Sequence, residues 1–169
     1  MSSIVKRCSV AAVLVLAALM PNYSFVKTSD EGLALIADLE DCRLSPYQCS
    51  AGVWTSGIGH TAGVKPANTI TEHDAARNLI TDIIMTERAV DKCMPVAMPQ
   101  PVYDAVVSLA FNVGTGAACG STLATFIRRG EWVKACQQLP RWVYVNGVKN
   151  KGLENRRARE LKHCLKGAS

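Results

Sequence analysis

The chain has 169 residues, of which 49% are hydrophobic and 20% are charged. This is the composition of an ordinary globular protein with enough length to bury a core, as one domain or as two lobes that share a long helix. The net charge of +5 suits an anionic partner such as a bacterial wall or a membrane surface. It is too small to indicate nucleic acid, and no basic and aromatic motif indicates nucleic acid either.

The first feature along the sequence is an apolar run over residues 9–20, preceded by Lys6 and Arg7. A charged start before an apolar run is the layout of a secretory signal, and a cleaved signal peptide is one interpretation. However, residues 19–22 lack the small-residue pattern of a cleavage site. The run is also shorter than the ~20 residues that a stable transmembrane helix needs. Lengthening it to residue 26 adds proline, asparagine and serine, so such a segment can enter a membrane and later leave it.

A short helix is expected next, because Thr28 and Glu31 have the spacing of a capping box and place the start of the helix near Ser29. Four residues then share one helical face: Leu33, Ile36, Ala37 and Glu40. That face should bury its apolar part and hold Glu40 near the C-terminal end of the helix, partly removed from water.

Short strands and tight turns are predicted over residues 43–63, where glycines and a proline alternate with aromatic and β-branched residues. Thr71 should cap a long helix that runs to about Cys93. An apolar helix is expected over residues 101–113, ended by Gly114. Shorter helices should follow at residues 121–129, 131–138 and 153–165.

Three polar residues have a spacing that suggests catalysis. Glu40 is followed after eight residues by Cys49 and after a further five by Thr55, and Gly57–His60 comes shortly afterwards. An acid at the end of a helix, followed by a turn and a glycine-bearing hairpin, can bring three polar side chains to one cleft. Cleavage of a glycosidic bond needs an acid that protonates the departing oxygen and a second group that activates water or traps the sugar cation.

This block resembles the active-site block of phage-type lysozymes, the endolysins of glycoside hydrolase family 24, in which a Glu, an Asp or Cys, and a Thr stand in this order and at these intervals. Residues 108–123, 128–148 and 151–165 resemble later blocks of that family, so the resemblance covers roughly residues 29–166. It implies an α+β, lysozyme-like fold. A small β-hairpin lobe and a larger helical lobe would be joined by a long helix, with a cleft between them and the N-terminal apolar segment in addition.

The resemblance implies a muramidase, which hydrolyses the β-1,4 bond between N-acetylmuramic acid and N-acetylglucosamine of peptidoglycan, with inversion. It also implies a monomer without a metal or an organic cofactor. Glu40 would be the acid. Cys49 stands where better-known members carry Asp and would place or activate water, and Thr55 would orient that water.

The residues alone leave simpler interpretations open, since Glu40 can be a solvated acid and Cys49 half of a disulfide. A disulfide-stapled wall-binding protein without catalysis is the alternative from another class, and it would not need Glu40.

The seven cysteines indicate an oxidising compartment, and their odd number leaves at least one thiol free or bonded to another chain. No pair has CxxC spacing and no histidine lies at a metal-ligand interval from a cysteine, so no zinc site is expected. Spacing alone allows three pairings of the later four: Cys93, Cys119, Cys136 and Cys164. Related phage lysozymes carry cysteines at similar places, which implies the structural disulfides Cys93–Cys119 and Cys136–Cys164.

Three cysteines then remain for a regulatory exchange: Cys8, Cys42 and Cys49. Cys42 and Cys49 flank one turn and can form a disulfide, while Cys8 is out of reach as long as residues 9–26 lie in a membrane. After release, Cys8 would attack Cys42 and free Cys49.

A subgroup of endolysins with a signal-anchor-release segment resembles this scheme. The resemblance implies such a segment over residues 1–27, a catalytic domain over residues 28–169, and passage from the host inner membrane, facing the periplasm, to a soluble periplasmic form. The alternative is a passive tether without exchange.

Overall fold

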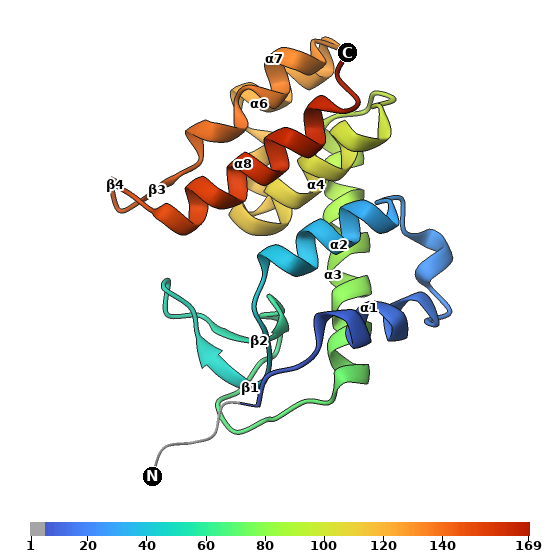
Figure 1. Ribbon diagram of the computed structural model, residues 1–169, viewed down its shortest axis with the longest axis vertical. Helices are drawn as coiled ribbons and strands as arrows, with labels where there is room; N and C mark the ends of the chain where they lie inside the picture. Colours follow the sequence, from blue (N-terminus) through green and yellow to red (C-terminus); the bar gives the residue numbers. More distant parts are fainter. Residues whose placement is uncertain (1–5) are drawn as a thin grey trace. The chain divides into compact units, whose positions relative to one another are not determined.

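The computed structural model describes residues 6–169, so the first five residues of the expected 1–27 segment lie outside the described part of the chain. The chain forms two compact units. The first comprises the segment up to Val26 together with Ile36–Ile84, and the second comprises Lys27–Leu35 together with Met85–Ser169. Both units are mainly helical, and each also contains a two-stranded antiparallel hairpin (Figure 1).

The apolar N-terminal segment folds as helix α1, Val10–Ala18, drawn in dark blue in Figure 1. The Ser9 hydroxyl caps this helix, and the Ser9 amide donates a hydrogen bond to the Glu72 carboxylate at 2.9 Å. Val13 and Ala17 are fully buried, so one face of α1 belongs to the core of the first unit. In the part of the chain that the structure describes, no helix has both the length and the apolar character needed to cross a bilayer.

Strands β1 (Cys42–Gln48) and β2 (Trp54–Ile58) form an antiparallel hairpin in the first unit, which confirms the short strands expected in this region. Gly52 lies in the turn with φ +76°, a backbone conformation that favours glycine. The Gly52 amide donates to the Cys49 carbonyl at 2.8 Å, and the Cys49 amide donates to the Val53 carbonyl at 3.0 Å. These two bonds close the turn and set the register of the residues on either side of it.

The residues before α1 pair with the edge of β1. The Cys8 amide donates to the Cys42 carbonyl at 3.1 Å, and the Leu44 amide donates to the Lys6 carbonyl at 2.8 Å. Residues 6–8 thus form an isolated antiparallel bridge, Arg7 with Arg43, beside the β1–β2 hairpin. The N-terminal segment is therefore bound to the first unit by backbone hydrogen bonds at one end and by the buried face of α1 at the other.

Helix α2 runs over Asp30–Leu39, after the 3-10 turn η1 at Tyr23–Phe25. Its start agrees with the sequence prediction, but its cap does not. The Ser29 hydroxyl accepts a hydrogen bond from the Gly32 amide at 3.0 Å, whereas the Thr28 hydroxyl donates to Glu87 at 2.6 Å. The capping-box interpretation of Thr28 was wrong because a carboxylate distant in sequence binds this side chain. Burial of the apolar α2 face is confirmed for Leu33, Ile36 and Ala37.

Helix α3, Glu72–Cys93, is the long helix that the sequence predicts, and it contributes residues to both units. Thr71 caps it as expected. The Thr71 hydroxyl accepts a hydrogen bond from the Asp74 amide at 3.1 Å, and the Asp74 carboxylate accepts one from the Thr71 amide at 3.0 Å. This reciprocal pair satisfies two amides at the helix start and explains why the helix begins where it does.

In the second unit, helices α4 and α8 pack along each other, and α6 packs against α7 (Figure 1). The elements after α3 are α4 (Gln100–Val113), α5 (Thr115–Cys119), α6 (Thr122–Arg128), α7 (Trp132–Cys136), η2 (Leu139–Arg141), β3 (Tyr144–Val145), β4 (Val148–Lys149) and α8 (Lys151–Leu165). The helices predicted after residue 100 are confirmed, with ends that differ by a few residues. The sequence analysis missed α5 and the β3–β4 hairpin, which are too short to show periodicity. The Asn146–Gly147 turn, with φ +49° and +77°, is the signal that identifies this hairpin.

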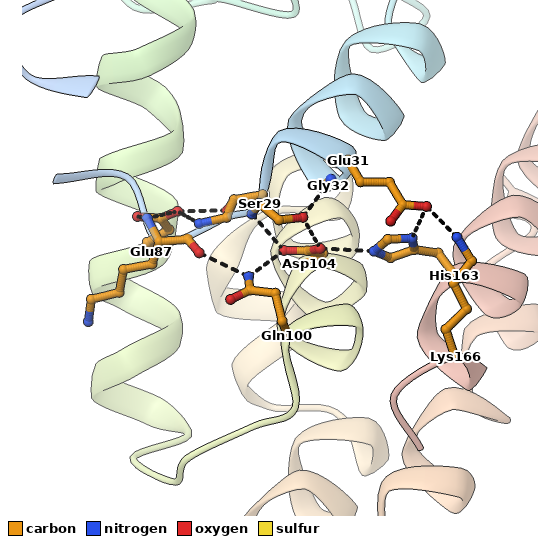
Figure 2. A network of polar contacts seen from close by, with 10 residues as sticks. Ser29, Glu31, Gly32, Glu87, Gln100, Asp104, His163 and Lys166 are labelled. Carbon is orange, nitrogen blue, oxygen red and sulfur yellow. Dashed lines mark hydrogen bonds and ion pairs between the residues drawn. The ribbon is translucent and has the colours of Figure 1, made fainter. Parts of the chain in front are cut away.

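A buried polar network joins the start of α2 to α4 and α8 within the second unit (Figure 2). Asp104, 1% exposed, is its centre. Its carboxylate accepts hydrogen bonds from the Ser29 amide at 3.0 Å, the Ser29 hydroxyl at 2.6 Å and the Gln100 side-chain amide at 2.8 Å, and it lies 2.9 Å from His163 Nε2. A Cβ at Gly32 would lie 2.5 Å from the Asp104 Cγ, so only glycine fits beside this carboxylate.

Replacing Asp104 by Leu should lower the free energy of unfolding by about 3–5 kcal/mol, because several buried polar groups lose a charged acceptor at once. Asp104→Asn keeps the shape of the side chain and part of its hydrogen bonding, so it should lower the free energy of unfolding by less. Urea unfolding of both variants measures the difference. Glu131→Gln, which removes exposed ion pairs with Lys134 and Arg129, is the matched control and should change stability by less than about 1 kcal/mol. An equally small effect of Asp104→Leu would contradict the assigned role of the network.

A second buried cluster joins α8 to α4. Glu160 is fully buried, accepts a hydrogen bond from the Ser108 hydroxyl at 2.6 Å and pairs with Arg157 Nε at 2.8 Å. Burial raises the pKa of Glu160, and the charge of Arg157 opposes that rise. The two clusters together fix α8 against α4 with directional contacts, which apolar packing by itself does not provide.

Candidate active site

All three residues of the predicted catalytic set belong to the first unit. Glu40 follows the last residue of α2, and its amide still donates to the Ile36 carbonyl at 3.1 Å, so the helix holds its backbone. Its side chain is half-buried. Cys49 and Thr55 lie on either side of the turn in the β1–β2 hairpin.

The hairpin register places Cys49 and Thr55 on the same face. Tyr47 stands directly opposite Thr55, and Cys49 is two residues after Tyr47. Side chains two residues apart on a strand point to the same side, as do directly paired residues on neighbouring strands. Tyr47, Cys49 and Thr55 therefore share one surface of the hairpin.

Cys49 and Thr55 are neighbours on this face of the hairpin. The Thr55 side chain is nearly buried, at 4% exposure, and its hydroxyl donates to the Val53 carbonyl at 3.1 Å. Hydrogen bonds from the backbone of Ala51, from the backbone of Val53 and from the Thr55 side chain hold the pKa of the Cys49 thiol below its ordinary value. The thiol therefore ionises more readily than an ordinary cysteine, and it is partly exposed.

Tyr47 is a residue of this site that the sequence analysis missed. Burial raises the pKa of its phenol, and the charge of Glu40 raises it further, with a smaller effect from Cys49. The charges of Glu40 and Cys49 therefore both act on this one phenol group. The Arg43 guanidinium lies 4.3 Å from the centre of the Tyr47 ring. The signal in the sequence is the tyrosine two residues before Cys49, which falls on the same strand face.

His60 has a structural role here. Its Nδ1 lies 2.7 Å from Asp82 Oδ2, and its backbone forms a bridge with Ser56. Burial raises the pKa of Asp82, while the contact with His60 opposes this rise. The pair connects the loop after β2 to α3 inside the first unit.

Six of the seven cysteines form disulfides, and all seven lie in the described part of the chain. The bonds are Cys8–Cys42, Cys93–Cys119 and Cys136–Cys164. The last two are the pairs that the family resemblance implies. Cys49 is free. The structure thus holds the isomer in which Cys8 is bonded to Cys42 and the thiol at the predicted catalytic position is available.

We expect alkylation of Cys49 by iodoacetamide to rise with pH around a midpoint below the ordinary thiol value, because the lowered pKa makes the thiolate appear at lower pH. Thr55→Val removes one of the hydrogen bonds and should move that midpoint to higher pH. Thr81→Val is a suitable control, because the Thr81 hydroxyl only donates to the Arg77 carbonyl of its own helix, at 3.0 Å. Mass spectrometry under non-reducing conditions follows the reaction, and identical profiles for wild type and Thr55→Val would contradict the assignment.

The arrangement of an acid after a helix and a thiol beside a threonine on a short hairpin agrees with the comparisons with known proteins. The family model for phage lysozyme matches residues 37–160. The SAR-endolysin of Escherichia phage P1 is 36% identical over 94% of this chain and 92% of its own length. The SAR-endolysin of Haemophilus phage HP1 is 34% identical over 86% of this chain and 85% of its own length. The chain belongs to the phage lysozyme family. It is a phage endolysin, and therefore a lysozyme-type glycoside hydrolase.

Solved structures support the same assignment and confirm the lysozyme-like fold. The crystal structure of the active form of the P1 phage endolysin Lyz has a TM-score of 0.85, with 34% identity and coverage of 97% of both chains. The secreted inactive form of that endolysin has a TM-score of 0.59, with 36% identity and coverage of 84% of this chain and 97% of the other. The fold described here is thus more similar to the active form than to the inactive form.

Proposed function

We propose that this endolysin hydrolyses the β-1,4 bond between N-acetylmuramic acid and N-acetylglucosamine in peptidoglycan, with Glu40, Cys49 and Thr55 as catalytic residues. The observation that carries the proposal is a free Cys49 thiol, with a lowered pKa, beside Thr55 on the hairpin that follows Glu40. The net charge of +5 favours binding to the anionic wall.

In this mechanism Glu40 donates a proton to the oxygen that leaves the muramic acid C1 atom. A water molecule attacks the same carbon from the opposite face, with inversion of configuration. The Cys49 thiolate accepts the proton of this water, and the Thr55 hydroxyl orients the Cys49 sulfur and the water. A lowered thiol pKa suits this role because more of the protein then carries the base at neutral pH.

Analysis of the reaction products tests which bond is cleaved. Cleavage of this bond leaves a new reducing end on N-acetylmuramic acid, so borohydride reduction of the digested wall should yield muramicitol. Glucosaminitol would instead indicate cleavage of the other glycosidic bond. Free amino groups without new reducing ends would indicate hydrolysis of the peptide stems, and either result would exclude the proposed reaction.

We further propose that residues 1–27 are a signal-anchor-release segment and residues 28–169 the catalytic domain, which acts as a monomer. The first form would reside in the host inner membrane and face the periplasm. The segment from residue 9 is apolar, lies next to a basic pair and is too short for stable insertion, which supports reversible residence in the membrane. The membrane potential favours a positively charged end on the cytoplasmic side, so its collapse is the expected trigger for release.

Release would activate the protein through thiol–disulfide exchange. In the tethered form, a periplasmic thiol oxidant joins Cys42 to Cys49, which removes the catalytic thiol. After release the Cys8 thiolate attacks the Cys42 sulfur, the Cys42–Cys49 bond breaks, and Cys49 leaves as a thiolate. The proton that Cys8 loses balances the one that Cys49 can take up, so the exchange needs no further oxidant or reductant.

Three observations support this scheme. The Cys8–Cys42 bond and the free Cys49 are the expected products of the exchange. Pairing of residues 6–8 with β1 brings the Cys8 and Cys42 backbones together, with a Cα–Cα distance of 5.3 Å. The greater similarity to the active form than to the inactive form of the P1 endolysin is consistent with an active state.

A further inference from the structure

Tyr47 occupies a position on the catalytic hairpin from which it can control Thr55. The two residues are directly paired across β1 and β2, so their side chains are neighbours on one face. Thr55 is nearly buried, while Cys49 on the same face is partly exposed. The ring is therefore next to the threonine on the side of the hairpin where the thiol lies.

The ring of Tyr47 is itself held in place. The Arg43 guanidinium lies over it, at 4.3 Å from the ring centre, in a cation–π contact. Arg43 Nε also pairs with Asp41 Oδ2 at 2.7 Å, and the Arg43 backbone forms an antiparallel bridge with Arg7. An arginine fixed at its backbone and at its head group restricts the ring beneath it.

We propose that Tyr47 is a positioning residue for the hydrolytic reaction, whose ring, held by Arg43, keeps the Thr55 side chain against Cys49. This inference rests on the proposed function of Cys49 and Thr55 and extends it to the residues behind them. A β-branched side chain has few χ1 rotamers, and an aromatic neighbour limits them further. Without the ring, the Thr55 side chain, whose hydroxyl donates to the Val53 carbonyl at 3.1 Å, has more room to move away from the sulfur.

The environment of the phenol supports this position. The charged or titratable groups that act on it are Glu40, Arg43, Asp41 and Cys49. Burial and the Glu40 charge raise the pKa of the Tyr47 phenol, so it stays neutral wherever the enzyme acts. A neutral ring can lie beside an acid and a thiolate without adding charge to the site.

The test compares Tyr47→Leu with Tyr47→Phe in the full chain, after non-reducing peptide mapping has established the Cys8–Cys42 isomer. Tyr47→Leu should raise the midpoint pH of Cys49 alkylation in the same direction as Thr55→Val. It should lower kcat roughly ten- to hundredfold, because misplacement of a catalytic group costs this much. KM on soluble peptidoglycan fragments should stay within about twofold, since the loss falls on the reacting geometry. Tyr47→Phe, which keeps the ring, should behave as wild type in both measurements.

Three outcomes would overturn the proposal. One is a wild-type alkylation profile in Tyr47→Leu. Another is a rise in KM with kcat unchanged, which would make Tyr47 a binding residue. The third is a Tyr47→Phe variant as impaired as Tyr47→Leu, which would make the hydroxyl rather than the ring essential. Circular dichroism establishes that each variant is folded, and Arg43→Gln provides an independent check because it should cause a smaller shift in the same direction.

These measurements separate this proposal from the proposed function. Alkylation of Cys49 needs no substrate, so it reports on the Tyr47–Thr55–Cys49 arrangement even if the enzyme cleaves another bond. Conversely, an active wild type whose alkylation profile is unaffected by Tyr47→Leu would retain the proposed function and remove only the role assigned to Tyr47.

Discussion

Replacing Glu40 by Gln should reduce hydrolysis of peptidoglycan by roughly 10²–10⁴-fold, which is the range expected when a general acid is removed. The amide has nearly the shape of the acid but cannot donate the proton that the leaving oxygen needs. Glu40 is held at its backbone by α2 and acts electrostatically on Tyr47, so the substitution should change the chemistry with little effect on the fold. Loss of turbidity of purified walls measures the rate.

The matched control is Asp38→Asn, which removes the same charge from an exposed residue on the helix that precedes Glu40. This variant should lyse walls at nearly the wild-type rate. Sedimentation with purified walls should show that Glu40→Gln still binds its substrate, which separates a catalytic loss from a binding loss. Near wild-type lysis by Glu40→Gln would exclude Glu40 as the acid.

Cys8→Ser should give an exported, folded protein that does not lyse cells under oxidising conditions, because no thiol remains to open the Cys42–Cys49 bond. Lysis should be lost completely rather than partly, since the Cys49 thiol stays blocked. A membrane-permeant reductant should restore lysis. This result would show that the variant lacks only the step that opens the Cys42–Cys49 bond. Normal, depolarisation-dependent lysis by Cys8→Ser would reject the exchange mechanism.

Cys42→Ser should have the opposite effect and lyse early or without depolarisation, because Cys49 then has no partner that can block it. A variant with both Cys93 and Cys119 changed to Ser is the control, since it removes a disulfide of the second unit and leaves the three exchanging cysteines intact. That control should lose stability, by about 3–4 kcal/mol on the loop-entropy estimate, while its lysis stays dependent on depolarisation. Early lysis by the control would attribute the effect to general destabilisation.

Several features of the protein can be predicted from the sequence because they depend on residues close together in the chain. The periodicity of apolar residues identifies α2, α3 and α4, and the hydrogen bonds of Thr71 agree with its predicted cap. The order and intervals of Glu40, Cys49 and Thr55 identify the family, and the family model confirms that membership. Such patterns are local, so propensity and spacing are sufficient to detect them.

Contacts between distant residues could not be predicted in this way. Thr28 has a local partner at the spacing of a capping box, yet it binds Glu87, 59 residues away, because packing in the second unit brings a buried carboxylate to it. The same holds for Ser29 and His163, which meet at Asp104 (Figure 2). Buried charges need partners, and which partner is available depends on how the helices pack.

The active-site hairpin depends both on local sequence patterns and on contacts between distant residues. By itself, the sequence determined the residue types, the glycine-bearing turn and the strand alternation that puts Tyr47 and Cys49 on one face. Only the tertiary structure decided that Arg43 covers the Tyr47 ring, that residues 6–8 pair with β1, and that Cys8 rather than Cys49 is bonded to Cys42. The physical reason is that strand alternation is a property of the local backbone, whereas pairing between distant backbone segments and the choice of disulfide depend on which segments the folded chain brings within bonding distance.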